Sequence, residues 1–164
     1  PVTILRPFNT YGPRQSMRAI IPTIANQFLQ NKKILQLGHL SPTRDYNYVE
    51  DIVSAFCCSI NNKKCVGEII NLGTGYEISV KNLAILISKI FDKKIQIKSE
   101  DLRKRPKKSE VERLCADNTK ARKILKWKPV YAGKTGLEKG LRKTISWFKQ
   151  HFNRKNKNNE TFYL

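Results

Sequence analysis

Short apolar runs alternate with amphipathic stretches along most of the chain, and this alternation predicts an α/β fold. β-type runs at residues 2–5, 34–37 and 68–72 are each followed by a turn that contains glycine or polar residues. Apolar residues at helical spacing predict helices over residues 20–29, from about 50 to 60, and after Ser79, which is a suitable N-cap.

The later part of the chain continues the alternation with longer polar interruptions. Asp117 is expected to cap a short helix, and Thr135-Gly136-Leu137-Glu138 matches the capping-box pattern at the start of a longer one. Residues 100–112 are polar and dense in both charges, so a loop is expected there. The Asn- and Lys-rich segment beyond His151 is expected to fray. The predicted organisation is one domain over residues 1–150 and a basic tail over residues 151–164.

The chain carries a net charge of +19, of which residues 1–60 contribute only +3. Such an excess predicts attraction to polyanions in general, and a basic nucleic-acid-binding module is one alternative that it leaves open. No recognised nucleic-acid-binding motif supports that alternative, so no specific nucleic-acid partner is expected. The apolar runs are far shorter than the roughly 20 residues of a membrane span, so no membrane partner is expected either.

The four cysteines form no CxxC pair, and His39 and His151 stand apart from them. The sequence therefore predicts neither a metal site nor a disulfide framework, and it favours a reducing, cytoplasmic setting. All four cysteines are expected to be small buried side chains.

A donor-rich turn follows the first apolar run and contains Asn9, Tyr11 and Arg14. Ligands of open α/β sheets bind at the carboxyl ends of strands, so these side chains are candidates for substrate binding. The alternative, which the residues alone leave equally open, is that Asn9 only stabilises its own turn.

Two further polar segments are candidates for binding an anion. Arg44 beside Tyr46 can present a bidentate fork to a phosphate or carboxylate, although an exposed Arg44–Asp45 arrangement of little energetic value explains the pattern as well. The basic stretch 103–108, with Arg113 beyond it, can bind phosphates or simply be solvated. Gly73-Thr74-Gly75 follows a strand but lacks the third glycine of a dinucleotide loop. The residues support anion binding but indicate no catalytic residue in this chain.

Several motifs occur in a fixed order along residues 1–150: Leu5-Arg6-Pro7-Phe8-Asn9-Thr10-Tyr11-Gly12-Pro13-Arg14-Gln15, Ile21-Pro22, Thr43-Arg44-Asp45-Tyr46-Asn47-Tyr48-Val49-Glu50-Asp51, Asn71-Leu72-Gly73-Thr74-Gly75, Arg105-Pro106, Ala116-Asp117 and Leu125-Lys126-Trp127-Lys128-Pro129. In this order they resemble the NAD-dependent nucleotide-sugar epimerases and dehydratases, which are extended short-chain dehydrogenase/reductases. Within that family, Pro13 to Ser16 and Leu40 to Asp45 look most like the UDP-N-acetylglucosamine 4,6-dehydratases of legionaminic-acid-type pathways.

The resemblance implies roles for particular residues. It implies that Asn9 contacts the nucleotide-sugar, that Arg44 grips its diphosphate, and that Arg105 and Arg113 add contacts to the diphosphate or nucleotide. It places Pro7 and Phe8 near the nicotinamide of NAD. The family's catalytic Tyr-x-x-x-Lys pair and glycine-rich NAD loop would lie before residue 1, and Tyr11 is not that tyrosine because Gln15 stands where the lysine would be.

The fold implied is the C-terminal part of a Rossmann-like extended short-chain dehydrogenase, with the last core strands and the smaller substrate-binding subdomain. Residues 1–150 would be the substrate-binding portion of a cytoplasmic lyase or isomerase of cell-surface polysaccharide biosynthesis, a homodimer at full length. NAD would be bound mainly by the preceding part, and a UDP-sugar is the favoured substrate. The chain alone is then expected to be inactive, and an inactive structural fragment remains a further alternative.

Overall fold

The computed structural model describes residues 1–94, 96–100 and 111–158, and its alternating strands and helices confirm the predicted α/β class. The chain divides into two units that are each described separately. The first unit comprises Pro1–Tyr11, Thr43–Ile78 and Arg113–Gly140. The second unit comprises Gly12–Pro42, Ser79–Glu112 and Leu141–Leu164.

The first unit contains β1 (Ile4–Pro7), β2 (Thr10–Tyr11), β4 (Thr43–Arg44), β5 (Asn47–Tyr48), α2 (Val49–Ile60), the 3-10 helix η1 (Lys63–Cys65), β6 (Ile69–Leu72), β9 (Arg113–Leu114) and α4 (Thr119–Ile124). The second unit contains α1 (Ile20–Leu29), β3 (Ile34–Leu37), α3 (Val80–Ile90) and β8 (Gln96–Ser99). The boundary between the units falls within β7 (Ile78–Ser79) and α5 (Gly133–Asn158).

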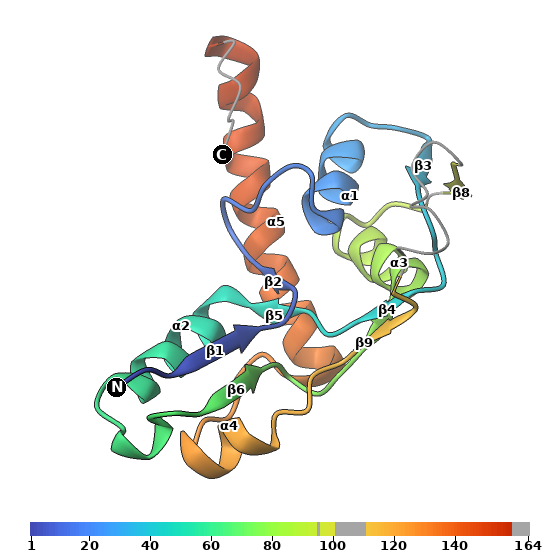
Figure 1. Ribbon diagram of the computed structural model, residues 1–164. Helices are drawn as coiled ribbons and strands as arrows, with labels where there is room; N and C mark the ends of the chain where they lie inside the picture. The colour runs from blue at the N-terminus through green and yellow to red at the C-terminus, as the bar shows by residue number, and fades with distance from the viewer. Residues whose placement is uncertain (95, 101–110, 159–164) are drawn as a thin grey trace. The chain divides into compact units, whose positions relative to one another are not determined.

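Parallel strand pairs form the framework of the first unit (Figure 1). β1 pairs with β6 from Ile4↔Ile69 to Pro7↔Leu72, and β2 and β4 pair in the same sense with β5 and β9. This arrangement pairs residues that lie far apart in the sequence, such as Ile4 with Ile69 and Thr43 with Arg113. The polar turn after β1 lies at the carboxyl end of that strand, as the sequence predicts.

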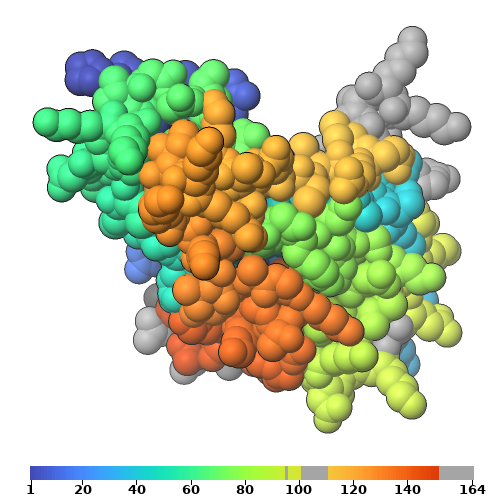
Figure 2. Space-filling model, turned by 90° about the horizontal axis from the view of Figure 1, so that it is seen from below, coloured from blue at the N-terminus to red at the C-terminus, as the bar shows by residue number. Residues whose placement is uncertain are grey.

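The core of the first unit lies on one face of the β1–β6 pair. Leu5 packs against a cluster formed by α2, η1, β6, α4 and the segment after α4, whose buried members are Ile52, Ala55, Cys65, Ile70, Leu72, Ala121, Leu125 and Trp127. Figure 2 shows the surface of α4, in orange, against the green segment around η1. The Asn62 side chain fixes this junction because its Nδ2 donates to the Ile124 carbonyl at 2.9 Å.

The opposite face of the β1–β6 pair carries apolar side chains that remain largely exposed. Ile4 and Ile69 are directly opposite in the register and are 47% and 41% exposed. In the part of the chain that the structure describes, β1 pairs with no strand other than β6. Parallel sheets in globular proteins are normally covered on both faces, and this face of the β1–β6 pair lacks such a cover among the described residues.

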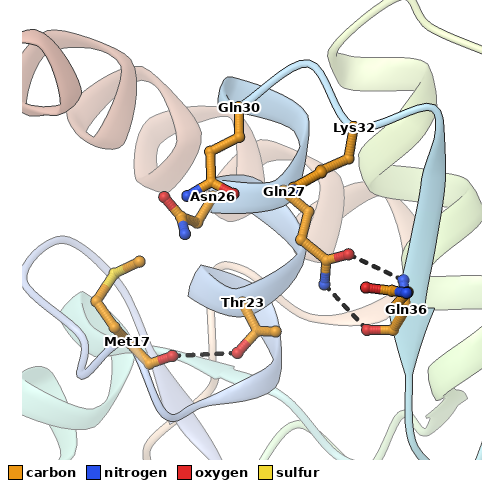
Figure 3. Close-up of a pocket in the computed structure, with 7 residues that line it drawn as sticks. All are labelled: Met17, Thr23, Asn26, Gln27, Gln30, Lys32 and Gln36. Atoms are coloured by element: carbon orange, nitrogen blue, oxygen red, sulfur yellow. Dashed lines mark hydrogen bonds between the residues drawn. The ribbon is translucent and has the colours of Figure 1, made fainter. Parts of the chain in front are cut away.

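In the second unit, α1 and α3 pack against each other through their apolar faces. The rings of Phe28 and Phe91 stack with centroids 4.8 Å apart, next to buried Ile24 and Ile87. β3 pairs in parallel with β8. The buried Gln27 amide donates from Nε2 to the Gln36 carbonyl (3.0 Å), and its Oε1 accepts the Gln36 N–H (2.9 Å), as Figure 3 shows. One α1 side chain thus satisfies both main-chain groups of a β3 residue.

Most predicted elements are confirmed, but the predicted capping box is wrong. α5 begins at Gly133, so Thr135 lies inside its first turn and cannot be the cap. The Gly136 N–H donates to the Ala132 carbonyl at 3.2 Å, which is the first helical bond. Asp117 lies just outside α4, where its Oδ1 accepts the Thr119 N–H at 2.9 Å, although Asn118 occupies the N-cap position. α5 continues as helix to Asn158, and fraying of its end stays a prediction.

The predicted burial of the cysteines is wrong for two of the four. Cys65 is buried and Cys115 is half-buried, but Cys57 and Cys58 are exposed on α2. The core-facing positions of this helix are taken instead by Asp51, Ile52 and Ala55.

Candidate functional site

The candidate site is built at the carboxyl end of β1, where Asn9 follows the strand. The Asn9 carbonyl accepts the N–H of Asn47 at 3.0 Å, which ties the turn to β5. The Asn9 Nδ2 atom is buried and meets no hydrogen-bond partner among the described residues. This donor makes no hydrogen bond to its own turn, and a buried donor without an acceptor costs about 1–3 kcal/mol. A substrate contact by Asn9 and its alternative role in the turn both stay predictions.

Pro7 and Phe8 end β1 beside Asn9. Pro7 is exposed, Phe8 is half-buried, and the Phe8 N–H donates to the Leu72 carbonyl at 2.9 Å. This bond fixes the main chain here. The position of both residues near a nicotinamide stays a prediction.

Tyr11 lies in the core, with 1% of its surface exposed. Its hydroxyl donates to the Leu137 carbonyl at 3.2 Å, and its ring lies 5.5 Å from that of Tyr48. Burial raises the pKa of Tyr11 well above the ordinary value of 10.0, so the phenol keeps its proton. These contacts give Tyr11 a packing role, and a substrate contact by Tyr11 stays an untested prediction.

Arg44 is half-buried on β4, and its Nη1 donates to the carbonyl of Thr43 at 2.8 Å. The neighbouring Tyr46 is buried, and desolvation raises its pKa to about 12 although the positive charge of Arg44 opposes the shift. The guanidinium thus stands beside a neutral phenol. Asp45 is fully buried, so the alternative of an exposed Arg44–Asp45 arrangement is wrong.

Arg113 lies on β9, opposite Thr43 in the register, and both residues contact Glu77. Glu77 Oε1 accepts from Arg113 Nε at 2.8 Å and lies 2.7 Å from Nη2, while Oε2 accepts the Thr43 hydroxyl at 2.7 Å. The hydrogen bond from Thr43 and then that from Arg113 lower the pKa of Glu77. Glu77 is an acidic member of this group that the sequence pattern did not single out.

Two further predicted binding residues, Arg14 and Arg105, cannot be placed beside Arg44 or the Arg113–Glu77 pair. Arg14 is exposed with a φ of 64°, and it belongs to the second unit. Arg105 lies outside the described residues. The binding roles predicted for both residues stay predictions.

Asp45 is the buried centre of this region and was missed as a functional residue. Its Oδ1 accepts the N–H and the hydroxyl of Thr74 at 3.2 and 2.6 Å. Its Oδ2 accepts the N–H groups of Gly75 and Ala116 at 2.9 and 3.3 Å. One carboxylate therefore joins the β4–β5 segment to two segments that are remote in sequence.

The Gly73-Thr74-Gly75 turn owes its glycines to this junction. A Cβ on Gly73 would lie 2.7 Å from Asp45 Oδ2 and would also clash with the Ala116 side chain. Gly75 has a φ of +74°, which favours glycine. The Asn118 amide donates to the Gly73 carbonyl at 2.7 Å and closes the turn. These contacts account for the turn without a cofactor.

A second buried carboxylate, Asp51, lies at the start of α2 with 2% of its surface exposed. Its oxygens accept the N–H groups of Val130 and Tyr131, each at 2.8 Å. Its carbonyl accepts the Trp127 indole N–H at 3.1 Å. The sequence placed this acid in the first turn of a helix but did not predict its burial or its distant partners.

Metal ligation and membrane insertion find no support in the described ranges, 1–94, 96–100 and 111–158. No three His, Cys, Asp or Glu side chains gather there in a way that suits a metal ion. No helix there combines the length and the apolar character that crossing a bilayer requires.

Comparison with known proteins places this arrangement in a family. Residues 1–144 match the family described as GDP-mannose 4,6 dehydratase. The dTDP-D-glucose 4,6-dehydratase of Homo sapiens is 34% identical over 159 residues, which cover 93% of this chain and 43% of the relative.

Solved structures agree. An epimerase from Methanothermobacter thermautotrophicus matches with a TM-score of 0.81 and 28% identity over 96% of this chain and 46% of its own. The UDP-glucuronic acid 4-epimerase of Bacillus cereus, solved with UDP-glucuronic acid and NAD, matches with a TM-score of 0.78 and 27% identity over 92% of this chain and 46% of its own.

The chain thus spans less than half the length of these relatives. The match runs through both units, since it covers residues 1–144. Epimerases and 4,6-dehydratases of nucleotide-sugars occur together among the relatives. The chain belongs to the nucleotide-sugar epimerase/dehydratase family of extended short-chain dehydrogenase/reductases.

Proposed function

We propose that this chain is the substrate-binding portion of an NAD-dependent nucleotide-sugar 4,6-dehydratase or epimerase and that it grips the nucleotide diphosphate. The observation that carries the proposal is the buried Nδ2 of Asn9 at the carboxyl end of β1, which has no hydrogen-bond partner among the described residues. A hydroxyl or carbonyl oxygen of a nucleotide-sugar is a suitable acceptor for this donor. Asn9 would then orient the substrate without taking part in bond breaking.

Arg44 is the residue that we assign to the diphosphate. A guanidinium matches the geometry of phosphate oxygens, and partial burial beside neutral Tyr46 makes the charge less screened by water. Arg113 is assigned a secondary contact, because Glu77 already takes the donors at its Nε and Nη2. Arg14 and Arg105 stay further candidates for substrate binding.

NAD would accept and return the hydride at the sugar when bound. The residues of this chain fit only one end of such a cofactor, because exposed Pro7 and half-buried Phe8 offer an apolar surface suited to a nicotinamide. The sequence contains no glycine-rich dinucleotide loop and no Tyr-x-x-x-Lys pair. We therefore assign most of the NAD binding, and the proton transfers, to a preceding part of the enzyme, without which this chain would be inactive.

The exposed face of the β1–β6 pair supports this assignment. Ile4 and Ile69 lie side by side on a parallel pair that has an open edge, and parallel sheets are normally buried on both faces. A NAD-binding part that continued the sheet would cover them.

Finer features remain part of the proposal. The favoured substrate is a UDP-sugar, and the favoured reaction is that of the UDP-N-acetylglucosamine 4,6-dehydratases of legionaminic-acid-type pathways. The complete enzyme would be a cytoplasmic homodimer in cell-surface polysaccharide biosynthesis. Within the chain, residues 1–150 would bind substrate, and residues 151–164 would be a tail.

The test is the affinity of the chain for a UDP-sugar, measured by titration calorimetry. We expect Arg44→Ala to weaken binding ten-fold or more, which corresponds to about 1.4 kcal/mol. Arg122→Ala, which removes an exposed charge from α4, is the matched control and should change little. In the complete enzyme the same change should raise the KM for the nucleotide-sugar while NAD affinity holds. Equal losses in both variants would show that only the overall positive charge attracts the ligand.

A further inference from the structure

Asp45 links the segments that carry Arg44, Glu77 and Arg113. It is 0% exposed and follows Arg44 directly in the chain. Its main-chain N–H donates to the Leu114 carbonyl at 2.9 Å, so main chain and side chain are both engaged.

Two partners of the Asp45 carboxylate lie close in sequence to the Arg113–Glu77 pair. Gly75 lies two residues before Glu77, and Ala116 lies shortly after Arg113 on β9. Glu77 in turn contacts both Arg113 and Thr43. These hydrogen bonds form one network that connects β4, the 73–77 segment and β9, and Asp45 lies at its centre.

The close packing around Asp45 leaves the three segments few alternative positions. The four donors that surround the carboxylate converge from Thr74, Gly75 and Ala116. Gly73 approaches so closely that a single methyl group would collide with Asp45. A displacement of any one segment would leave buried polar groups without their hydrogen-bond partners, which is unfavourable.

We infer that Asp45 is a positioning residue that holds Arg44 and the Arg113–Glu77 pair in the arrangement that receives the diphosphate. The inference rests on the proposed function in one respect only, namely that the ligand of this group is the nucleotide-sugar. Asp45 acts through the main chain of its neighbours and contacts no substrate atom.

Asp45→Asn is the direct test. An amide has the size of the carboxylate, but its NH2 group cannot accept the main-chain N–H groups that converge on it. Asp51→Asn is the matched control, because Asp51 is also buried and accepts two main-chain N–H groups, but from Val130 and Tyr131 and not from the segments of Glu77 and Arg113. We expect the first variant to weaken UDP binding ten-fold or more and the second to change it less than two-fold.

A second readout needs no ligand. The Arg113 Nε–H, which bonds to Glu77 at 2.8 Å, should give a distinct NMR resonance in the wild-type chain. We expect Asp45→Asn to shift it to the position of a solvated arginine and Asp51→Asn to leave it in place. A variant that was merely destabilised would not show this selectivity.

Thr74→Val is the milder second variant if Asp45→Asn does not fold. It removes the hydroxyl that donates to Asp45 Oδ1 at 2.6 Å and accepts the Tyr76 N–H at 3.1 Å, and it keeps the Thr74 N–H bond to Asp45. We expect a loss of UDP affinity of about three-fold together with a partial shift of the Arg113 signal. Equal losses in the Asp45 and Asp51 variants, or an unmoved Arg113 signal, would overturn the positioning role. Absence of UDP binding in the wild-type chain would instead refute the proposed function, and the Arg113 signal would still decide the role of Asp45.

Discussion

Asp45 and Asp51 are two buried acids that lie before and after β5 in the sequence, and they form the same kind of hydrogen bond with different parts of the molecule. Both accept main-chain N–H groups from segments distant in sequence. The partners of Asp45 lie in the segments of Glu77 and Arg113, whereas those of Asp51 lie in the segment between α4 and α5. Burial and hydrogen bonding are common to both acids, so what separates them is whether their partners lie in segments that carry other charged side chains.

The largest difference is expected from removing each carboxylate. Asp45→Ala leaves the N–H groups of Thr74, Gly75 and Ala116 without their acceptor, and an unsatisfied buried donor costs about 1–3 kcal/mol. We expect a loss of about 3 kcal/mol or more in the free energy of unfolding, measured with urea. Asp51→Ala deprives two N–H groups and should cost less. A larger loss for Asp51→Ala would reverse the ranking of the two carboxylates.

Gly73→Ala should have the next largest effect on the free energy of unfolding. Its energetic coupling to each acid, measured in double mutants, should distinguish Asp45 from Asp51. Overpacking of this kind typically costs about 1–3 kcal/mol. The added methyl group meets the Ala116 side chain and Asp45 but not Asp51, so the part of the cost that is due to Asp45 should fall in an Asp45→Ala background, and the whole cost should stay additive in an Asp51→Ala background. A double-mutant cycle of urea unfolding measures this, and additivity in both backgrounds would contradict the close approach.

Trp127→Phe should weaken only the Asp51 side, by about 1 kcal/mol. The indole N–H donates to the Asp51 carbonyl at 3.1 Å and to the Ser54 hydroxyl at 2.9 Å, and phenylalanine loses both bonds. Thermal unfolding would measure the loss. UDP affinity should stay the same, and a drop in affinity would show that the two regions are coupled.

The smallest effect is expected from the pH dependence of stability. Burial, opposed by the two N–H bonds, raises the pKa of Asp51 above its ordinary value of 3.8. In the window above that value the folded state holds a proton that the unfolded state has released, so the contribution of Asp51 to stability falls as pH rises. Asp51→Asn should remove this slope, as the difference between wild-type and variant unfolding curves measured upward from pH 3.8. An identical slope in both proteins would contradict the raised pKa.

Local sequence patterns predicted the parts of the fold that local forces decide. The apolar periodicity of α1, α2 and α3 and the Ser79 cap are confirmed, and Asn9 lies at a strand end as expected. The junction at Asp45 could not be predicted in this way, because its partners Thr74 and Ala116 lie 29 and 71 residues away.

The misplaced start of α5 shows how tertiary contacts override a local signal. Gly136 lies in the predicted capping box, but a Cβ there would collide with the main chain of Tyr131. Tyr131 is in turn tied to Asp51 through its N–H. The helix begins at Gly133, whose φ of +66° lies in the left-handed region that favours glycine, and the Thr135 pattern is not used as a cap.

The Gln27 amide in the second unit has a consequence for self-association. By bonding to both main-chain groups of Gln36, it mimics the hydrogen bonds of a neighbouring strand without supplying a strand. A strand from another molecule would have to displace a buried glutamine before it could add to β3 at this residue. The edge of β3 is therefore protected at this residue against the addition of a strand from another copy of the chain, a protection that comes from a side chain and not from a further strand.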